Sequence, residues 1–216
     1  EIKPSPYWVQ RRLRISGMRP INNIVDATNY AMLEVGEPLH AFDYDVLVRR
    51  AGGKAPTILT RTAQPGERLT TLDGVERTLD DFTVLVCDTA GALSIAGVMG
   101  GAESEVNENT RNVLLEGAAW NFINIRRTVN AQRLPSEAAY RFSRGVHPAM
   151  ADRGVGRCLE LMRRWSGGTV CQGLVDNYPL PPVDPVVEIT PEQVRKWLGI
   201  ELAPGEIAEL LGRLEF

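Results

Sequence analysis

The chain has 216 residues, of which 44% are hydrophobic, and its 24 basic and 27 acidic side chains give a net charge of −3. This composition provides enough apolar side chains for a substantial core, and it excludes collagen, coiled coils and disordered tails. No stretch of 18 apolar residues occurs, so we expect no membrane-spanning helix. Three cysteines are too few for a disulfide scaffold and no signal-peptide core follows the first residues, so we expect a cytoplasmic protein.

The apolar residues recur with a helical period toward both ends of the chain and with a period near two in its middle. Helices are predicted over residues 7–16, 22–35, 121–134, 136–143, 148–165, 191–198 and 204–214. Strands are predicted over residues 57–62, 68–72, 75–79, 82–87, 92–96, 112–118 and 169–177. Residues 37–43 show no clear period, and we expect a loop there. Helices on both sides of a run of strands predict the α+β class, with a mixed β core flanked by helices.

Capping residues mark the starts of three of these helices. Ser5 and Pro6 predict the N-cap and the first residue of the first helix. Ser136 is the predicted N-cap of the short helix, and Thr190 with Gln193 forms a capping-box pattern.

Proline enrichment predicts the domain organisation. Residues 1–178 are predicted to form one domain, and residues 179–185, which include four prolines, a stiff linker. Residues 186–216 are predicted to begin a second, small α/β module. Because these roughly 31 residues are too few for a core of their own, we expect the chain to be a fragment that ends inside that module.

Basic residues are concentrated in one part of the sequence. Residues 111–170 contain ten arginines and four acidic residues, a local charge of +6. Arginine makes bidentate contacts with phosphate, so a surface for a polyanion such as RNA is one interpretation. A solvated helical face and a coding bias toward arginine are the alternatives.

The sequence contains no common catalytic or metal-binding motif. Neither His40 nor His147 accompanies a Gly-x-Ser-x-Gly element, and the cysteines lack metal-ligand spacing. The glycine-rich segment 96–102 predicts either a turn or room for a ligand. Glu116 ends an apolar segment, and strand alternation favours a solvent-facing side chain over a buried one with a polar partner.

Seven motifs follow one another along the chain: GMRPI (17–21), VDATNY (25–30), EPLHAFD (37–43), LDG (72–74), AGVMGGAES (96–104), NVLLE (112–116) and RFSRGV (141–146). In this order they resemble the β subunit of bacterial phenylalanine–tRNA ligase over roughly residues 5–175. The segment from about residue 186 resembles the start of the next module of that subunit.

The resemblance implies the editing module, which hydrolyses tyrosine wrongly esterified to the tRNA for phenylalanine. It implies catalytic roles for His40, Thr28, Asn29 and Ser136, substrate binding by Arg19, Gly100, Glu116 and Ala138, and no metal site. The implied partners are the acceptor end of tRNA(Phe), the tyrosine moiety and the α subunit of a heterotetramer. ATP and Mg²⁺ are expected for the complete ligase, and no cofactor is expected in this segment.

These residue types suit that task. A desolvated Glu116 carboxylate accepts the phenol proton of tyrosine in a charge-assisted bond, and phenylalanine leaves it unpaired. Gly100 and Ala138 leave room for the ring. His40 is expected to orient the water or the terminal ribose and to act as a base.

Two alternatives remain open. Gln132 and Tyr140 stand where the family commonly has histidine, and His147 stands where it has an acid. These departures motivate an editing-deficient domain of the same subunit that only positions tRNA. A general RNA-binding module is the other alternative, and the net charge of −3 and the lack of an aromatic stacking platform in the sequence argue against it.

Overall fold

The computed structural model describes residues 1–179, 183 and 185–216. These residues form two compact units, Glu1–Gly173 and Leu174–Phe216. Most of the predicted linker lies outside the described residues, because positions 180–182 and 184 fall within it. The larger unit combines helices with antiparallel sheets, which confirms the α+β class.

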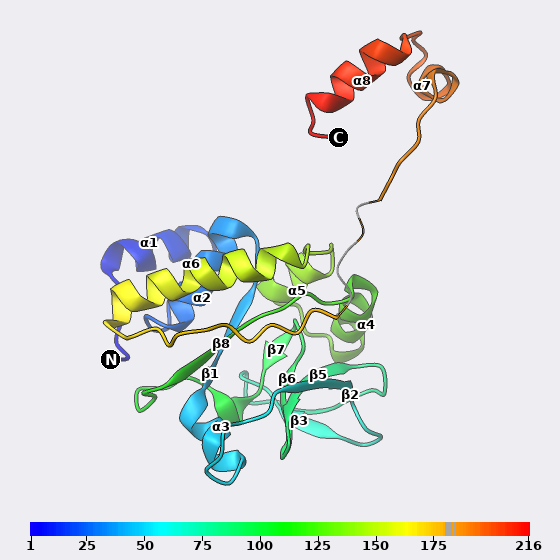
Figure 1. Ribbon diagram of the computed structural model, residues 1–216. Coiled ribbons are helices and arrows are strands. Elements are labelled where there is room, and N and C mark those ends of the chain that lie inside the picture. Colours follow the sequence, from blue (N-terminus) through cyan, green and yellow to red (C-terminus); the bar gives the residue numbers. More distant parts are fainter. Residues whose placement is uncertain (180–182, 184) are drawn as a thin grey trace. The chain divides into compact units, whose positions relative to one another are not determined.

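The elements of the larger unit follow the expected order of helices, strands and helices (Figure 1). They are α1 (Tyr7–Ile15), α2 (Val25–Val35), β1 (Leu39–Asp43), α3 (Tyr44–Arg50), β2 (Leu59–Thr62), β3 (Arg68–Thr70), β4 (Glu76–Thr78), β5 (Val84–Asp88), β6 (Gly91–Ile95), β7 (Met99–Gly100), the 3-10 helix η1 (Ala102–Ser104), β8 (Val113–Gly117), α4 (Phe122–Gln132), α5 (Glu137–Phe142) and α6 (Ala149–Ser166). The smaller unit contains α7 (Pro191–Leu198) and α8 (Pro204–Gly212).

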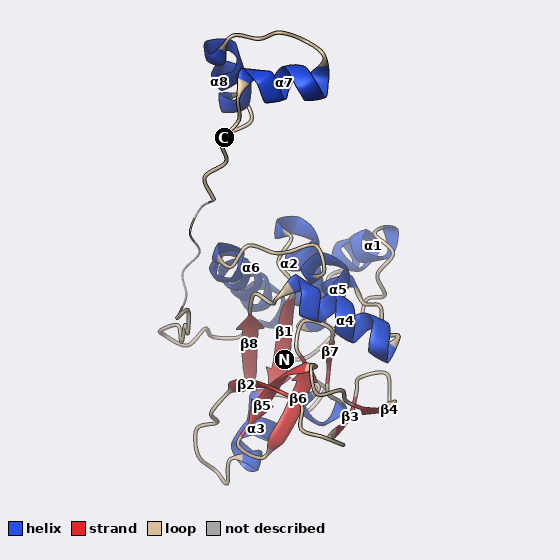
Figure 2. Cartoon of the chain, turned by 90° about the vertical axis from the view of Figure 1, so that its right-hand side faces the viewer, coloured by secondary structure: helices blue, strands red, loops and turns tan. Residues whose placement is uncertain are grey.

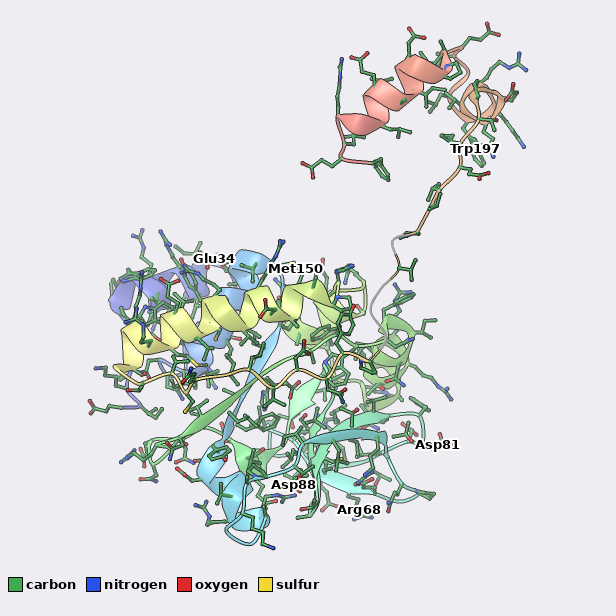
Figure 3. The ribbon with its side chains drawn as sticks, viewed as in Figure 1. Glu34, Arg68, Asp81, Asp88, Met150 and Trp197 are labelled. Carbon is green, nitrogen blue, oxygen red and sulfur yellow. The ribbon has the colours of Figure 1, made fainter. Side chains whose placement is uncertain are left out.

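Three antiparallel sheets form the β structure of the larger unit. β1 pairs with β8, the strands β2-β5-β6-β7 form a four-stranded sheet, and β3 pairs with β4. In both views α1, α2 and α6 lie together on one side of β1 and β8 (Figures 1 and 2). Glu34 and Met150 mark this helical layer in Figure 3, and Asp88 and Arg68 mark the strands on the other side.

The β1–β8 ladder separates two hydrophobic clusters. Ala41 and Leu115 pack with the apolar faces of α1, α2 and α6. Phe42 and Leu114 project to the opposite face and pack against Val86 and other residues of β5 and β6. Because successive side chains of a strand alternate between its faces, both faces of this ladder are covered by protein.

The four-stranded sheet is also covered on both faces. Leu85 and Ile95 pack beneath α4 and α5, where Ile125 and Phe142 are buried. The successive layers are therefore the helices α1, α2 and α6, the β1–β8 ladder, the four-stranded sheet, and α4 with α5. Of the candidate site residues, His40, Gly100 and Glu116 lie in the middle two layers.

The capping predictions are confirmed at two of three helices. The Ser136 side chain accepts a hydrogen bond from Ala139 N, and Thr190 and Gln193 form the capping box of α7. The N-cap of α1 is Pro6 instead of Ser5, because Pro6 has φ −49° and ψ 140°, outside the helical region. The prediction for this helix was wrong by one residue.

Three further predictions were wrong. Residues 37–43 do not form a loop, because Leu39–Asp43 is strand β1; this strand is covered on both faces, which removes the alternation. The helix α3 was missed; it follows β1 directly, and the Asp43 carboxylate accepts a hydrogen bond from Val46 N at its start. Residues 169–177 contain no strand: this exposed segment includes Gly173 at φ +94° and pairs with no other strand.

The smaller unit has a minimal core. Val194 of α7 and Ile207 of α8 are its buried side chains among the described residues. These described residues form helices and no strand. None of the helices in the described ranges of the chain is long and apolar enough to cross a membrane.

Candidate functional site

The β1–β8 ladder places His40 directly opposite Glu116. Opposed side chains of an antiparallel pair lie on the same face, with Cβ atoms about 4.5–5.5 Å apart. The strand positions of His40 and Glu116 match those of Phe42 and Leu114, so both side chains project toward the four-stranded sheet. The predicted sensor and the predicted base therefore share one face.

Gly100 in β7 lies against this pair. A Cβ atom at Gly100 would lie 2.5 Å from His40 Cε1 and 2.8 Å from His40 Nε2, closer than real Cβ atoms approach. The absence of a side chain at Gly100 thus lets the imidazole pack against the β7 backbone. The edge of the His40 ring also meets Phe42, with ring centroids 4.4 Å apart. The structure therefore brings His40, Glu116 and Gly100 together.

Glu116 is shielded although it is polar. Its Oε2 atom is buried and accepts no hydrogen bond, and burial raises the pKa of the carboxyl from 4.5 to about 7. The alternation argument for a solvent-facing side chain was wrong, because the four-stranded sheet covers the outer face of β8. Leaving a buried acceptor without a partner costs about 1–3 kcal/mol. A carboxylate at this position therefore does not stabilise the fold, and its presence calls for a functional explanation.

His40 is unpartnered in the same way. Its Nε2 atom is buried and has no hydrogen-bond partner. Burial lowers the pKa of the imidazole from 6.5 to about 4, so the ring is neutral at pH 7. A neutral imidazole with a free ring nitrogen can accept a hydrogen bond from water or donate one to a ligand, depending on its tautomer.

Glu37 is a third buried group, on the α6 side of the ladder, and sequence reasoning missed it. Its side chain is fully buried, and neither carboxylate oxygen has a hydrogen-bond partner. Burial raises the pKa of Glu37 to about 8, and the charge of Glu116 adds to this rise. The nearby Ala118 backbone N–H lowers the pKa, but this effect is smaller than that of burial. It packs under α6, where a Cβ atom at Gly154 would lie 2.6 Å from Glu37 Cγ. No local signal indicates this burial, because α6 is distant in the sequence.

Ser136 and Ala138 lie next to the glycine-rich segment. The Ser136 hydroxyl donates to the Val98 carbonyl at 2.7 Å, which fixes the start of α5 against the residues that precede Gly100. Ala138 packs against the core beneath α5. The hydroxyl proton of Ser136 is thus committed to Val98, and its oxygen accepts from Ala139 N at 3.1 Å.

Three predicted site residues lie on neighbouring elements instead of on the ladder. Thr28 and Asn29 belong to α2, which contacts β1, and Arg19 belongs to the segment between α1 and α2. The Thr28 hydroxyl donates to the Val25 carbonyl at 2.7 Å. Arg19 is exposed, and no acidic side chain of the described ranges pairs with it.

The residues that depart from the family pattern lie outside the β1–β8 face. The Gln132 amide donates to the Thr78 carbonyl at 3.0 Å and so ties α4 to β4. His147 Nδ1 accepts from Ala149 N at the start of α6. Tyr140 is exposed on α5.

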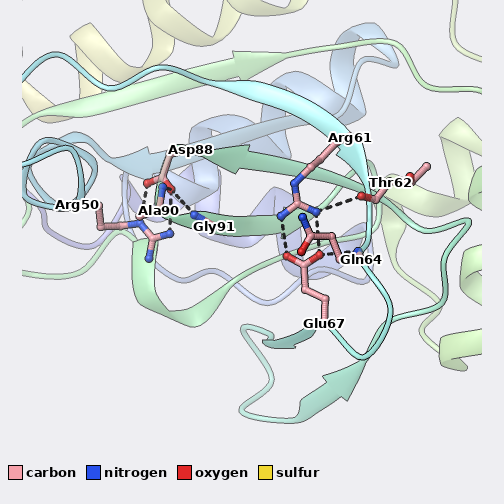
Figure 4. Close-up of polar contacts among 8 residues, drawn as sticks. All are labelled: Arg50, Arg61, Thr62, Gln64, Glu67, Asp88, Ala90 and Gly91. Atoms are coloured by element: carbon pink, nitrogen blue, oxygen red, sulfur yellow. Dashed lines mark hydrogen bonds and ion pairs between the residues drawn. The ribbon is translucent and has the colours of Figure 1, made fainter.

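The buried carboxylate of Asp88 is fully partnered, as Figure 4 shows. Arg50 Nε lies 2.6 Å from Asp88 Oδ2, and Asp88 Oδ1 accepts from the Ala90 and Gly91 N–H groups at 2.9 Å. Asp26 and Glu37 also have buried oxygens without partners, so what distinguishes Glu116 and His40 is that they lie opposite each other on one face of the ladder.

Two surface cavities lie elsewhere. One, of about 300 Å³, is bounded by α1 and α2, and the other, of about 430 Å³, lies beside Arg50 and Glu103. None of the eight predicted site residues lines either cavity. Within residues 1–179, 183 and 185–216, no three His, Cys, Asp or Glu side chains are arranged to hold a metal ion.

Comparison with known proteins identifies the family. The model of the B3/4 domain family matches residues 1–167. The chain is 47% identical over 213 residues to the phenylalanine–tRNA ligase beta subunit of Moorella thermoacetica, covering 99% of this chain and 26% of that protein. The corresponding subunits of Symbiobacterium thermophilum and Geobacter sulfurreducens are 45% and 42% identical, over 99% and 100% of this chain and 23% and 26% of theirs. The chain spans about a quarter of the length of these relatives. It belongs to the B3/4 domain family, and along almost its whole length it is similar to part of the phenylalanine–tRNA ligase β subunit.

Proposed function

We propose that this chain is the editing module of a phenylalanine–tRNA ligase β subunit and hydrolyses the ester of tyrosine wrongly attached to tRNA(Phe). Residues 1–178 act as the editing domain, and residues 186–216 begin the next module. Similarity to phenylalanine–tRNA ligase β subunits supports the subunit, and the His40–Glu116 pair supports the activity. An editing site is needed because a synthetic site rejects a close analogue of its substrate imperfectly.

The observation that carries the proposal is the shielded and unpartnered carboxylate of Glu116. The phenol O–H of tyrosine donates to this oxygen, whereas phenylalanine leaves it buried and unpaired at a cost of about 1–3 kcal/mol. That cost corresponds to about tenfold to a few hundredfold preference for tyrosine, at ~1.4 kcal/mol per decade. Because Oε2 is covered in the free protein, the ligand displaces part of that cover when it binds.

The remaining residues position the reacting ester. Water adds to the ester carbonyl carbon, the bond to the ribose oxygen breaks, and that oxygen takes up the proton. Neutral His40 accepts a hydrogen bond from the attacking water or orients the ribose. The oxygens of Thr28 and Ser136 remain available to accept a hydrogen bond from the amino group, and Asn29 offers its amide. Arg19 contacts the terminal phosphate, and Ala138 lies beside the ring.

The reaction makes few further demands. An aminoacyl ester is already activated, so positioning of water and ester supplies most of the effect. We therefore expect no ATP, Mg²⁺ or other cofactor to take part in this step, although ATP and Mg²⁺ serve the synthetic site of the complete ligase. The α subunit is the proposed protein partner, and the cytoplasm is the proposed compartment.

Deacylation of tRNA(Phe) charged with tyrosine or with phenylalanine tests the proposal. We expect the protein to release tyrosine faster, and Glu116→Ala to remove the difference. Glu108→Ala is the control, because Glu108 is exposed in the turn before β8 and does not belong to the β1–β8 ladder. Equal rates for the two esters in the unmutated protein would contradict editing and favour the tRNA-positioning alternative.

A further inference from the structure

The surface of α4 and α5 carries arginines stacked on aromatic rings. The Arg126 guanidinium lies 5.0 Å from the centroid of the Phe122 ring, and the Arg144 guanidinium lies 3.6 Å from the Tyr140 ring. These four side chains are named the arginine–aromatic surface. A third pair lies beside it, with Arg127 3.7 Å from the ring of Phe82. The structure thus forms a stacking platform that the sequence alone does not reveal.

The two pairs form one continuous surface. Arg126 Nε donates to the Ser143 carbonyl at 2.6 Å, and the next residue, Arg144, donates to the Tyr140 carbonyl at 2.6 Å. The Tyr140 side chain remains 57% exposed and Phe122 42% exposed, so one face of each ring stays open to a further planar group.

Charge separates this surface from the arginine-rich face of α6. Between residues 121 and 146 the chain has five arginines and one acid, Glu137. That acid pairs with Arg141, whereas Arg126, Arg127 and Arg144 pair with no acid in the described part of the chain. On α6, by contrast, Glu160 pairs with both Arg157 and Arg164. The arginine–aromatic surface is therefore a cationic patch whose charges are free for a ligand.

The surface is linked to the candidate site. Tyr140 lies on α5, whose N-cap Ser136 is bonded to the Val98 carbonyl, two residues before Gly100. The His40 ring packs on Gly100. A ligand that reaches from the His40–Glu116 face along α5 therefore arrives at exposed rings and unpaired guanidinium groups.

We infer that the arginine–aromatic surface binds the unpaired 3′ end of a structured RNA. Bases stack on aromatic rings with little sequence preference, and arginine contributes phosphate contacts and stacking of its own. This inference rests on the proposed function, because it supplies the holding site for the strand that carries the ester. It replaces the expectation that the chain lacks a stacking platform.

Binding of two RNA hairpins to the full-length protein tests the inference independently of catalysis. One hairpin carries a four-nucleotide single-stranded 3′ extension, and the other is blunt. We expect the extension to tighten binding at least tenfold, since a base stacked on an aromatic ring contributes about 1–3 kcal/mol. Tyr140→Ala should remove most of that gain, Tyr140→Phe should retain it, and Arg144→Met should also lower the salt dependence by about one charge.

Two variants serve as matched controls. Tyr7→Ala removes a tyrosine of α1 that is 74% exposed and has no stacked arginine among the described residues. Arg164→Met removes an arginine that is already paired with Glu160. Neither should change the gain from the extension. Equal binding of the two hairpins, or an unchanged gain in Tyr140→Ala, would overturn the inference.

The deacylation assay separates this inference from the proposed function. Tyr140→Ala should raise KM for tyrosyl-tRNA about tenfold and leave kcat and the preference for tyrosine within about twofold, because Glu116 is intact. If the protein binds the extended hairpin through Tyr140 but hydrolyses neither ester, the proposed function fails and the RNA-binding surface stands.

Discussion

Arg50–Asp88 and His40–Glu116 are two polar pairs in the same unit, and they differ in whether their buried atoms have hydrogen-bond partners. Both oxygens of Asp88 have partners (Figure 4), and the Arg50 guanidinium bonds to Asp88 and also to Glu103. Glu116 Oε2 and His40 Nε2 are equally buried and have none. A buried charge whose bonds are complete stabilises the fold, whereas one left open lowers stability until a ligand completes it. The first pair therefore contributes to the fold, and the second is the pair that we propose binds the ligand.

The largest expected effect is on the completed pair. Asp88→Ala leaves the mostly buried Arg50 without its main partner, and loss of one member of a buried ion pair costs about 3–5 kcal/mol. Urea unfolding at pH 7 measures this loss. The preference for tyrosyl-tRNA should persist in the protein that remains folded. A loss below ~1 kcal/mol would remove the distinction between the two pairs.

Substitution of Glu37 should raise the stability of the protein, whereas substitution of Asp88 should lower it. Its pKa is raised to about 8 from 4.5, so unfolding releases a proton between these values and stability falls as the pH rises through that window. Glu37→Gln removes the penalty: we expect equal stability at pH 4 and a gain of up to about 5 kcal/mol at pH 9, because the shift of about 3.5 pKa units corresponds to ~1.4 kcal/mol per unit. Urea unfolding at both pH values checks it, and a loss of stability at pH 9 would contradict the burial argument.

Glu116→Gln should behave similarly over a narrower range. The pKa of Glu116 is raised to about 7, so its stability penalty develops between pH 4.5 and 7. Because the residue is only partly buried overall, we expect a gain of about 2 kcal/mol at pH 8 and none at pH 4. The same variant should keep only part of the preference for tyrosine, because its amide oxygen accepts the phenol O–H without the negative charge. A variant that is more stable and less selective would show that stability is sacrificed for binding at this position.

The smallest effect is expected at a partnered surface pair. Arg61 makes two bonds of 2.7 Å to the Glu67 carboxylate, but the arginine remains about a third exposed (Figure 4). Arg61→Met should lower the free energy of unfolding in urea by about 0.5–1 kcal/mol. This loss should be smaller at high salt, because salt screens the ion pair in the unmutated protein. A loss of stability as large as that of Asp88→Ala would mean that burial does not determine how much an ion pair contributes to stability.

The elements that were predictable from sequence carry their signals locally. The start of α5 follows from the Ser136 cap, and α6 follows from its apolar period and the Gly167 that ends it. Strand β1 was not predictable by periodicity, because elements distant in sequence cover both of its faces and remove the alternation of apolar and polar residues.

The candidate site shows the same division. Family motifs indicated Glu116 and His40, while strand alternation alone placed Glu116 in solvent. Alternation cannot reveal that a second sheet covers the outer face. Glu37 and the stacked pair of Tyr140 and Arg144 had no local signal, because burial and stacking depend on elements that meet only in the folded chain.

Titration of the Glu116 carboxyl by ¹³C NMR tests the central claim most directly, with Glu116→Gln used to assign the signal. We predict a pKa near 7 in the free protein, and a lower value with saturating tyrosine, because the phenol O–H favours the ionised form. Phenylalanine should not lower it. A free-protein value near 4.5, or equal responses to tyrosine and phenylalanine, would contradict the assignment of Glu116 as the group that selects tyrosine.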